Sequence, residues 1–172
     1  MSEPSRNGGG GPHPLVEVTF PLGFAAAHRM VNPRFSAERN LQLYGKCSYP
    51  SGHGHTYRLE VTIRGPVEPD TGRVAGSEAL EAAARRTVTD GFDHTYLNDL
   101  LTPADGPAST TEVIAGLLWR RLDAALPGRL WRLRVEETPN NFFELDRQSA
   151  GSAGAVPAPS GARPVQERTE EA

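Results

Sequence analysis

The stretch GKCSYPSGHGHTY at residues 45–57 places three side chains that can bind a metal ion or move a proton within nine positions. Cys47 is the only cysteine of the chain, and His53 and His55 follow it with one glycine between them. On a β-strand, residues i and i+2 point to the same side, so the two imidazoles can lie next to each other. The pattern is compatible with a metal site, a reactive thiol or a chance grouping.

A third histidine ends the segment LVEVTFPLGFAAAH at residues 15–28, in which apolar residues alternate as in a half-buried strand. Residues 55–64 alternate in the same way, and if the two segments pair as a hairpin, His28 meets His53 and His55. Three protein ligands with an open fourth position are typical of catalytic zinc, whereas structural zinc is closed by four ligands. The alternative is that the two neighbouring histidines are a chance feature of an exposed strand end.

The side chains of Cys47, Asp93 and His94 are suited to proton transfer, and each also has an interpretation without a catalytic role. A lone cysteine such as Cys47 is more often a small buried hydrophobe, although a nearby cation favours the reactive thiolate form of a thiol. His94 directly follows Asp93 in FDHTYLND, where the acid can orient the imidazole. The alternative for this pair is an ordinary contact at the end of a helix.

A glutamate follows the apolar face of a predicted strand at residues 130–138, LWRLRVEET. The apolar residues occupy odd positions from Trp131 onward, so Glu137 shares their face and Glu136 points to the other side. A buried carboxylate is costly unless it is hydrogen-bonded or paired. Glu137 is therefore a candidate ligand-binding residue, unless the strand end emerges into solvent.

The elements that must position these residues follow the order of two strands, two helices and two strands. Their expected ranges are 15–28 and 55–64 for the first strands, about 77–88 and 110–126 for the helices, and 130–138 and 142–145 for the last strands. Ser77 is a candidate helix cap, and Ser109-Thr110-Thr111-Glu112 has the capping-box pattern. This order predicts an α+β fold with helices on one face of an antiparallel sheet. The polar loop of roughly 25 residues between the first two strands is long enough to suggest a function.

Composition predicts one domain with two tails. The chain has 172 residues, and Gly, Pro, Ala and Ser are concentrated in residues 1–14 and 148–172, which we expect to be disordered around a domain at 15–147. A net charge of −3 without a basic cluster argues against a nucleic-acid partner. The absence of a long apolar stretch argues against a membrane, and a single cysteine is consistent with a reduced, cytoplasmic protein.

Several motifs occurring in order resemble the 6-pyruvoyl-tetrahydropterin synthase family. They are FAAAHR, NLQLYGKC followed by five residues and HGHTY, FDHTYLND, STTE and EETPNN, which together span about residues 24–145. The five residues between Cys47 and His53 resemble the pyruvoyl synthases, whereas the related 6-carboxy-tetrahydropterin synthases usually have three. The resemblance implies a tunnelling fold (T-fold). In that fold a four-stranded antiparallel sheet carries two helices on one face, and several subunits form a barrel.

The resemblance also assigns roles to particular residues. It implies that Zn²⁺ is bound by His28, His53 and His55, that protons are transferred by Cys47, Asp93 and His94, and that the pterin is bound by Glu137, with Thr110 and Thr111 near its ring. The implied reaction converts 7,8-dihydroneopterin triphosphate to 6-pyruvoyl-tetrahydropterin without a redox cofactor. Family members combine Asp and His from one subunit with the zinc site of another. We therefore expect a homo-oligomer, most simply a hexamer of two trimers, whose neighbours cover the open sheet face and strand edges.

Three alternatives stay open at this point. The Ala-, Arg- and Gly-rich composition is also compatible with a bacterial 6-carboxy-tetrahydropterin synthase of queuosine or deazapurine synthesis, and Pro139 replaces an acidic residue of animal-type members. A non-catalytic pterin- or metal-binding module is a second alternative. A structural zinc site is a third, and it would require a fourth protein ligand.

Overall fold

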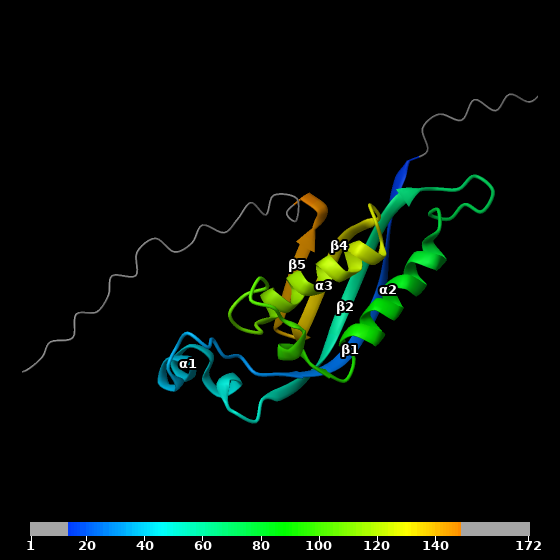
Figure 1. The fold of residues 1–172 in the computed structure, drawn as a ribbon. Helices are drawn as coiled ribbons and strands as arrows, with labels where there is room; N and C mark the ends of the chain where they lie inside the picture. The colour runs from blue at the N-terminus through cyan, green and yellow to red at the C-terminus, as the bar shows by residue number, and fades with distance from the viewer. Residues whose placement is uncertain (1–13, 149–172) are drawn as a thin grey trace, which may run out of the picture.

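The computed structural model describes residues 14–148, which form one α+β unit (Figure 1). In chain order the elements are β1 (Leu15–His28), α1 (Ala37–Tyr44), η1 (Gly45–Ser48), β2 (His53–Pro66), α2 (Ser77–Phe92), β3 (Thr95–Tyr96), η2 (Leu97–Leu100), α3 (Thr111–Ala125), β4 (Leu130–Thr138) and β5 (Asn141–Asp146). The tails predicted to be disordered lie outside the described residues, apart from one residue at each end. No helix within residues 14–148 is both long and apolar enough to cross a membrane.

The strands form a single mixed sheet in the order β3-β1-β2-β4-β5. The four long strands pair antiparallel as expected, whereas β3 pairs parallel with β1. The prediction of a purely antiparallel, four-stranded sheet is therefore corrected to five strands. Because β3 has only two residues, it carries no alternating pattern that a sequence could reveal.

Helices α2 and α3 cover the same face of the sheet (Figure 1). That face is built from alternate strand residues, and the rings of Phe24 and Tyr57 stack there with their centroids 4.7 Å apart. The apolar stripe predicted for α3 is confirmed, since Ile114, Leu118 and Leu122 are fully buried. Burial of this apolar surface is the main force that holds the helices on the sheet.

The long connection between β1 and β2 contains structure that the sequence did not predict. Helix α1 begins after Ser36, whose side chain accepts a hydrogen bond from Arg39 N at 3.2 Å. Helix α1 and the short η1 project from one end of the sheet, away from α2 and α3 (Figure 1). Cys47 lies on η1, so the only thiol is held on a structured segment.

Two expected helix caps are wrong. Helix α2 begins after Gly76 instead of being capped by Ser77, and it continues to Phe92, whose ring is buried in the core. Thr110 occupies the N-cap of α3 without a side-chain hydrogen bond. The Ser109 hydroxyl instead donates to the backbone carbonyl of Arg29 at 2.8 Å, because the segment that precedes α3 lies against the end of β1.

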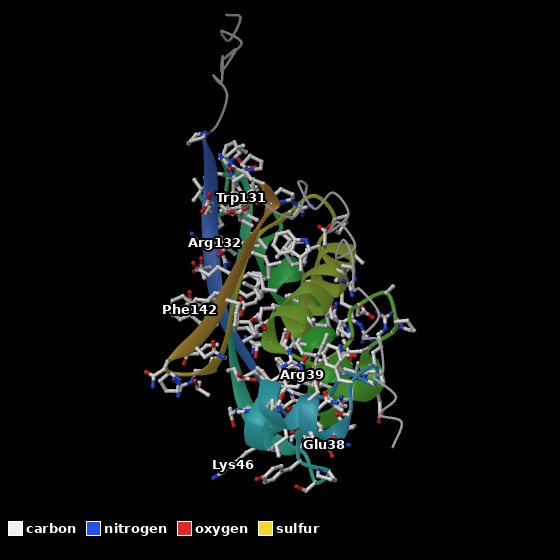
Figure 2. All side chains as sticks on the ribbon, turned by 90° about the vertical axis from the view of Figure 1, so that its left-hand side faces the viewer. Glu38, Arg39, Lys46, Trp131, Arg132 and Phe142 are labelled. Carbon is white, nitrogen blue, oxygen red and sulfur yellow. The ribbon has the colours of Figure 1, made fainter. Side chains whose placement is uncertain are left out.

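The other face of the sheet is polar. Arg134 lies over the ring of Phe142 at 4.1 Å, and 49% of Phe142 is exposed. Arg132 and Phe142 lie on the side turned away from the helices (Figure 2). Trp131, expected on the buried face, is the extra residue of a β-bulge in the β2–β4 pairing and lies under Arg64 at 4.3 Å. Leu130 takes the buried position instead.

Candidate active site

Three histidines converge where β1 ends and β2 begins. The register pairs His28 directly with His53, and His55 follows two residues later on the same face. One ring nitrogen from each of the three residues lies within 4.8 Å of the others, and the Nε2 atoms of His28 and His53 are 3.1 Å apart. The predicted meeting of His28 with the other two histidines is confirmed.

A glycine permits this close approach. Gly52 precedes β2 with a φ of 63°, a left-handed conformation that favours glycine. A Cβ atom at this position would lie 2.9 Å from the carbonyl oxygen of His28, which is closer than atoms tolerate. The turn can therefore bring His53 against His28 only with glycine at position 52.

The surroundings of His28 fix which of its nitrogens carries a proton. Its ring is fully buried, and Nδ1 lies 2.8 Å from the carbonyl oxygen of Ser109. Because a carbonyl only accepts, Nδ1 must donate, which leaves Nε2 with a free lone pair directed at the cluster. Burial lowers the pKa of His28 and of His53 below the ordinary histidine value. Both rings are therefore neutral at pH 7, the form that binds a metal ion.

The cluster fits a divalent cation. His55 Nε2 is buried and has no hydrogen-bond partner among residues 14–148, and an unpaired buried polar atom costs about 1–3 kcal/mol. A cation between the three rings would accept its lone pair, and three imidazoles suit zinc with one position open. Within the described part of the chain the group contains only His28, His53 and His55, so a closed structural site with four protein ligands finds no support.

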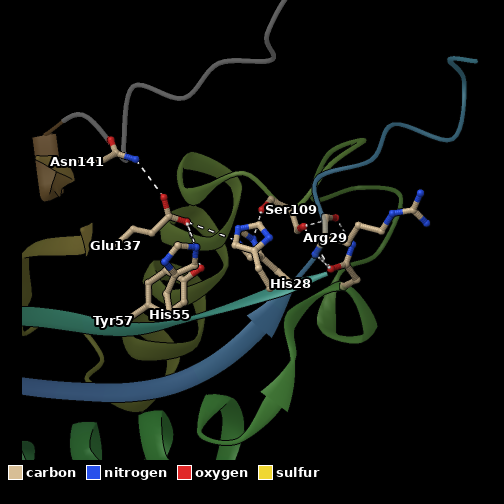
Figure 3. A network of polar contacts seen from close by, with 9 residues as sticks. His28, Arg29, His55, Tyr57, Ser109, Glu137 and Asn141 are labelled. Atoms are coloured by element: carbon tan, nitrogen blue, oxygen red, sulfur yellow. Dashed lines mark hydrogen bonds and ion pairs between the residues drawn. The ribbon is translucent and has the colours of Figure 1, made fainter. Parts of the chain in front are cut away.

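Glu137 lies beside the histidines on the buried face, as its position in the strand predicts. It is the extra residue of a β-bulge between β4 and β5, and such bulges often re-aim a side chain at a site. Its Oε1 atom lies 3.5 Å from His28 Nε2 and 3.8 Å from His55 Nε2. Tyr57 donates to Oε1 at 3.3 Å and Asn141 to Oε2 at 3.1 Å, as Figure 3 shows.

Tyr57 is a donor at every pH near neutrality. Burial, followed by the nearby charge of Glu137, raises the pKa of Tyr57 well above its ordinary value. The phenol therefore keeps its proton and directs it at the carboxylate. With Asn141 on the other oxygen, Glu137 is held in a single orientation that leaves it able to accept further hydrogen bonds.

Asp93 and His94 lie at the end of α2, next to the edge strand of the sheet. Asp93 accepts from the backbone N–H of Ala25 at 2.8 Å and pairs with His94 Nδ1 at 3.0 Å. The bond from Ala25 is the main reason that the pKa of Asp93 lies below its ordinary value. His94 has a φ of 55°, and its side chain is 83% exposed. Its ring is thus presented to solvent and takes no part in the histidine cluster.

The remaining predicted residues lie near the cluster without joining it. Cys47 is a partly buried free cysteine whose backbone carbonyl accepts from Met30 N at 2.9 Å, two residues beyond His28. Thr110 is the N-cap of α3, and the buried hydroxyl of Thr111 has no hydrogen-bond partner among the described residues. One chain therefore brings together the three histidines and Glu137, but not the thiol or His94.

Sequence reasoning missed three residues of the site. Tyr57 lies on the same strand face as His55, and this position could have indicated a place in the site. An aromatic residue on a buried strand face is, however, usually interpreted as part of the hydrophobic core. The sequence around Asn141 indicates a turn, and the sequence around Ser109 indicates a helix cap. Neither local pattern shows that the residue contacts a distant segment of the chain. All three bond to His28 or Glu137 from other segments (Figure 3).

Comparisons with known proteins agree with this arrangement. A family model described as 6-pyruvoyl tetrahydropterin synthase matches residues 17–148. The human 6-pyruvoyl tetrahydrobiopterin synthase is 37% identical over 135 residues, covering 78% of this chain and 93% of that protein. A 6-carboxy-5,6,7,8-tetrahydropterin synthase from Bacillus subtilis is 28% identical over 151 residues, covering 83% and 93%.

The fold has a solved counterpart as well. The structure of Caenorhabditis elegans 6-pyruvoyl tetrahydropterin synthase superposes with a TM-score of 0.71 at 30% sequence identity, covering 78% of this chain and 97% of that one. The sequence match therefore extends over the strands and helices that position the histidines and Glu137. On this ground the chain belongs to the 6-pyruvoyl tetrahydropterin synthase family.

Proposed function

We propose that the protein is a zinc-dependent lyase that converts 7,8-dihydroneopterin triphosphate to 6-pyruvoyl-tetrahydropterin and releases triphosphate. The observation that carries this proposal is the group of three converging imidazoles beside a buried, hydrogen-bonded carboxylate. Such a group can hold a metal ion and a heterocycle next to each other. The identity of 37% to a synthase of the pyruvoyl type supports the choice of reaction.

His28, His53 and His55 would hold the zinc ion. Bound there, zinc would act as a Lewis acid towards the hydroxyl groups of the substrate side chain, which acidifies the neighbouring C–H bonds. The protein contributes the three imidazoles and, through Ser109, a fixed proton on the far side of His28. A ligand oriented in this way binds more tightly than a freely rotating one.

Glu137 would orient the pterin. Its carboxylate can accept hydrogen bonds from a ring N–H and the adjacent amino group, the donor pair that a pterin presents. Tyr57 and Asn141 keep the carboxylate in place for this contact. Thr110 and Thr111 would line the ring, and the unpaired, buried hydroxyl of Thr111 is available for such a contact.

Cys47, Asp93 and His94 would move the protons. The thiolate of Cys47 removes a proton from a side-chain carbon, and His94, oriented by Asp93, exchanges a proton on the opposite face. The C–O bond to triphosphate breaks with its electron pair leaving on the triphosphate, and tautomerisation yields the two carbonyl groups of the product. No external oxidant or reductant is needed, because the substrate is rearranged internally.

We further propose that the active unit is a cytoplasmic homo-oligomer with the T-fold barrel architecture, most simply a hexamer of two trimers. Two features support this. His94 points into solvent within its own chain, so a neighbouring subunit can bring it to a second zinc site. The helix-free face of the sheet also remains uncovered, with Phe142 about half exposed on it.

Identification of the reaction product distinguishes the proposed 6-pyruvoyl-tetrahydropterin synthase activity from 6-carboxy-tetrahydropterin synthase activity. The 28% identity to a 6-carboxy-tetrahydropterin synthase makes that enzyme the second candidate. Zinc-loaded protein is incubated with dihydroneopterin triphosphate, and the products are identified by mass. We expect 6-pyruvoyl-tetrahydropterin and triphosphate. Carboxylated pterin together with acetaldehyde would instead establish the second candidate.

A further inference from the structure

His28 and the residue that follows it, Arg29, are held by two residues that lie outside the histidine cluster. We propose that Asn98 and Ser109 are positioning residues that set the tautomer and orientation of His28 for metal binding. Asn98 belongs to the FDHTYLND motif and Ser109 to STTE, but neither received a role from its motif. The inference rests on the proposed function in one respect, namely that His28 is a zinc ligand.

Ser109 forms hydrogen bonds to two consecutive residues, His28 and Arg29. Its carbonyl accepts from His28 Nδ1 at 2.8 Å, and its hydroxyl donates to the carbonyl of Arg29 at 2.8 Å. Ser109 and His28 are both fully buried, so water does not substitute for the bond between them. Figure 3 shows Ser109 between the ring of His28 and the backbone of Arg29. The ring and the backbone that carries it are thus fixed by one residue.

Asn98 binds both backbone polar groups of Arg29. Its Oδ1 atom accepts from Arg29 N at 2.9 Å, and its Nδ2 atom donates to Arg29 O at 2.8 Å. The parallel pairing of β3 with β1 ends at Tyr96, opposite Ala27. Beyond the end of β3, the side-chain amide of Asn98 therefore provides the hydrogen bonds to Arg29 that a longer strand would provide with its backbone. It secures the residue that follows His28.

The hydrogen bonds of Ser109 and those of Asn98 belong to one network, because the Ser109 hydroxyl lies 3.3 Å from Asn98 Oδ1. If the end of β1 moved, His28 Nδ1 would lose its carbonyl acceptor. The ring proton could then occupy Nε2, and a protonated Nε2 cannot bind a metal ion. Outer hydrogen-bond partners of metal ligands typically contribute 10–100-fold to metal affinity. We expect an effect of this size here.

The test measures the zinc dissociation constant of metal-free protein by chelator competition. We expect Asn98→Ala to raise it about 10–100-fold, and Ser109→Ala about 10-fold because its backbone carbonyl remains. Asn98→Asp keeps the acceptor for Arg29 N but loses the donor, so its effect should be intermediate. Asp99→Ala is the matched control, since Asp99 is the exposed neighbour on η2, and it should bind zinc like the unchanged chain.

Nitrogen NMR of the His28 ring in metal-free protein gives a second readout that needs no metal. The unchanged chain should show the Nδ1–H tautomer, and Asn98→Ala a mixture of both tautomers. Unchanged zinc affinity together with an unchanged tautomer in all three variants overturns the inference. Should Asn98→Ala fail to fold, Asn98→Asp and Ser109→Ala decide. If the unchanged chain binds no zinc, the proposed function fails, while the ring spectra still show whether these residues fix His28.

Discussion

Within residues 14–148, the two histidine-bearing regions are built in opposite ways. His28 is fully buried, and its ring is fixed by Ser109, while the carboxylate of Glu137 lies beside it. His94 is 83% exposed and is held only through Asp93 and its backbone. The backbone N–H of His94 donates to Ala25 O at 2.6 Å, so the residue is anchored although its ring is exposed to solvent.

The difference distinguishes side chains whose polar contacts are completed within one chain from a side chain that can still contact a neighbouring molecule. Buried polar groups must satisfy one another within the chain, because leaving them unpaired is costly. An exposed ring on a fixed backbone has no such need and can serve a neighbouring molecule. Under the proposed function, a single chain would bind the metal and the pterin, and a neighbouring subunit would supply one half of the proton transfer.

The largest effect should come from removing one histidine of each region. His53→Ala should abolish stoichiometric zinc binding and turnover, because only two imidazoles remain. His94→Ala should keep its zinc but lose about 10²–10⁴-fold in kcat. Metal analysis and steady-state kinetics on the purified variants measure both. Loss of zinc in His94→Ala would break the proposed division.

Co-expression sharpens the same comparison. Mixed oligomers of His53→Ala and His94→Ala should regain part of the activity, since some boundaries combine an intact zinc site with an intact Asp93–His94 pair. Each variant expressed alone is the control. No rescue in oligomers shown to contain both chains would contradict a shared site.

The next effect concerns the thiol of Cys47. Cys47→Ala should retain zinc and substrate binding and lose about 10²–10⁴-fold in kcat, the usual contribution of a general base. Lys46→Ala is the matched control, because Lys46 is the exposed neighbour on η1 (Figure 2). Full activity of Cys47→Ala would remove the thiol from the mechanism. An unchanged chain without turnover on any dihydropterin would favour a binding module.

The smallest effect is on stability and depends on pH. The pKa of Asp93 is lowered in the folded protein from 3.8, so its carboxylate stabilises the fold above that pH. The stabilisation is lost as the pH falls below this value, through the folded pKa. Asp93→Asn should therefore be less stable than the unchanged chain at pH 6, by a margin that shrinks below about pH 4. Urea midpoints over this range, with Asp99→Asn as control, measure it, and a margin independent of pH would contradict the assignment.

The sequence by itself determined the parts of the fold that depend on local periodicity. Alternation at residues 15–28 placed His28 on the buried face of a strand, and the two-residue spacing of His53 and His55 put them on one side. The same parity placed Glu137 with the apolar residues, and the structure confirms this position. These predictions hold because side-chain direction on a strand follows from residue count alone.

Only the tertiary structure decided what each of these side chains touches. Ser109 lies in a helix-capping pattern, yet it fixes His28 because the segment that precedes α3 lies against the end of β1. Two β-bulges made Trp131 leave the predicted face and seated Glu137 against Tyr57 and Asn141. A bulge adds one residue and so reverses the alternation of faces across it, at a position that the residue types do not mark. A contact between segments 81 residues apart leaves no local signal. Long-range packing, which local periodicity does not encode, therefore sets the geometry of the site.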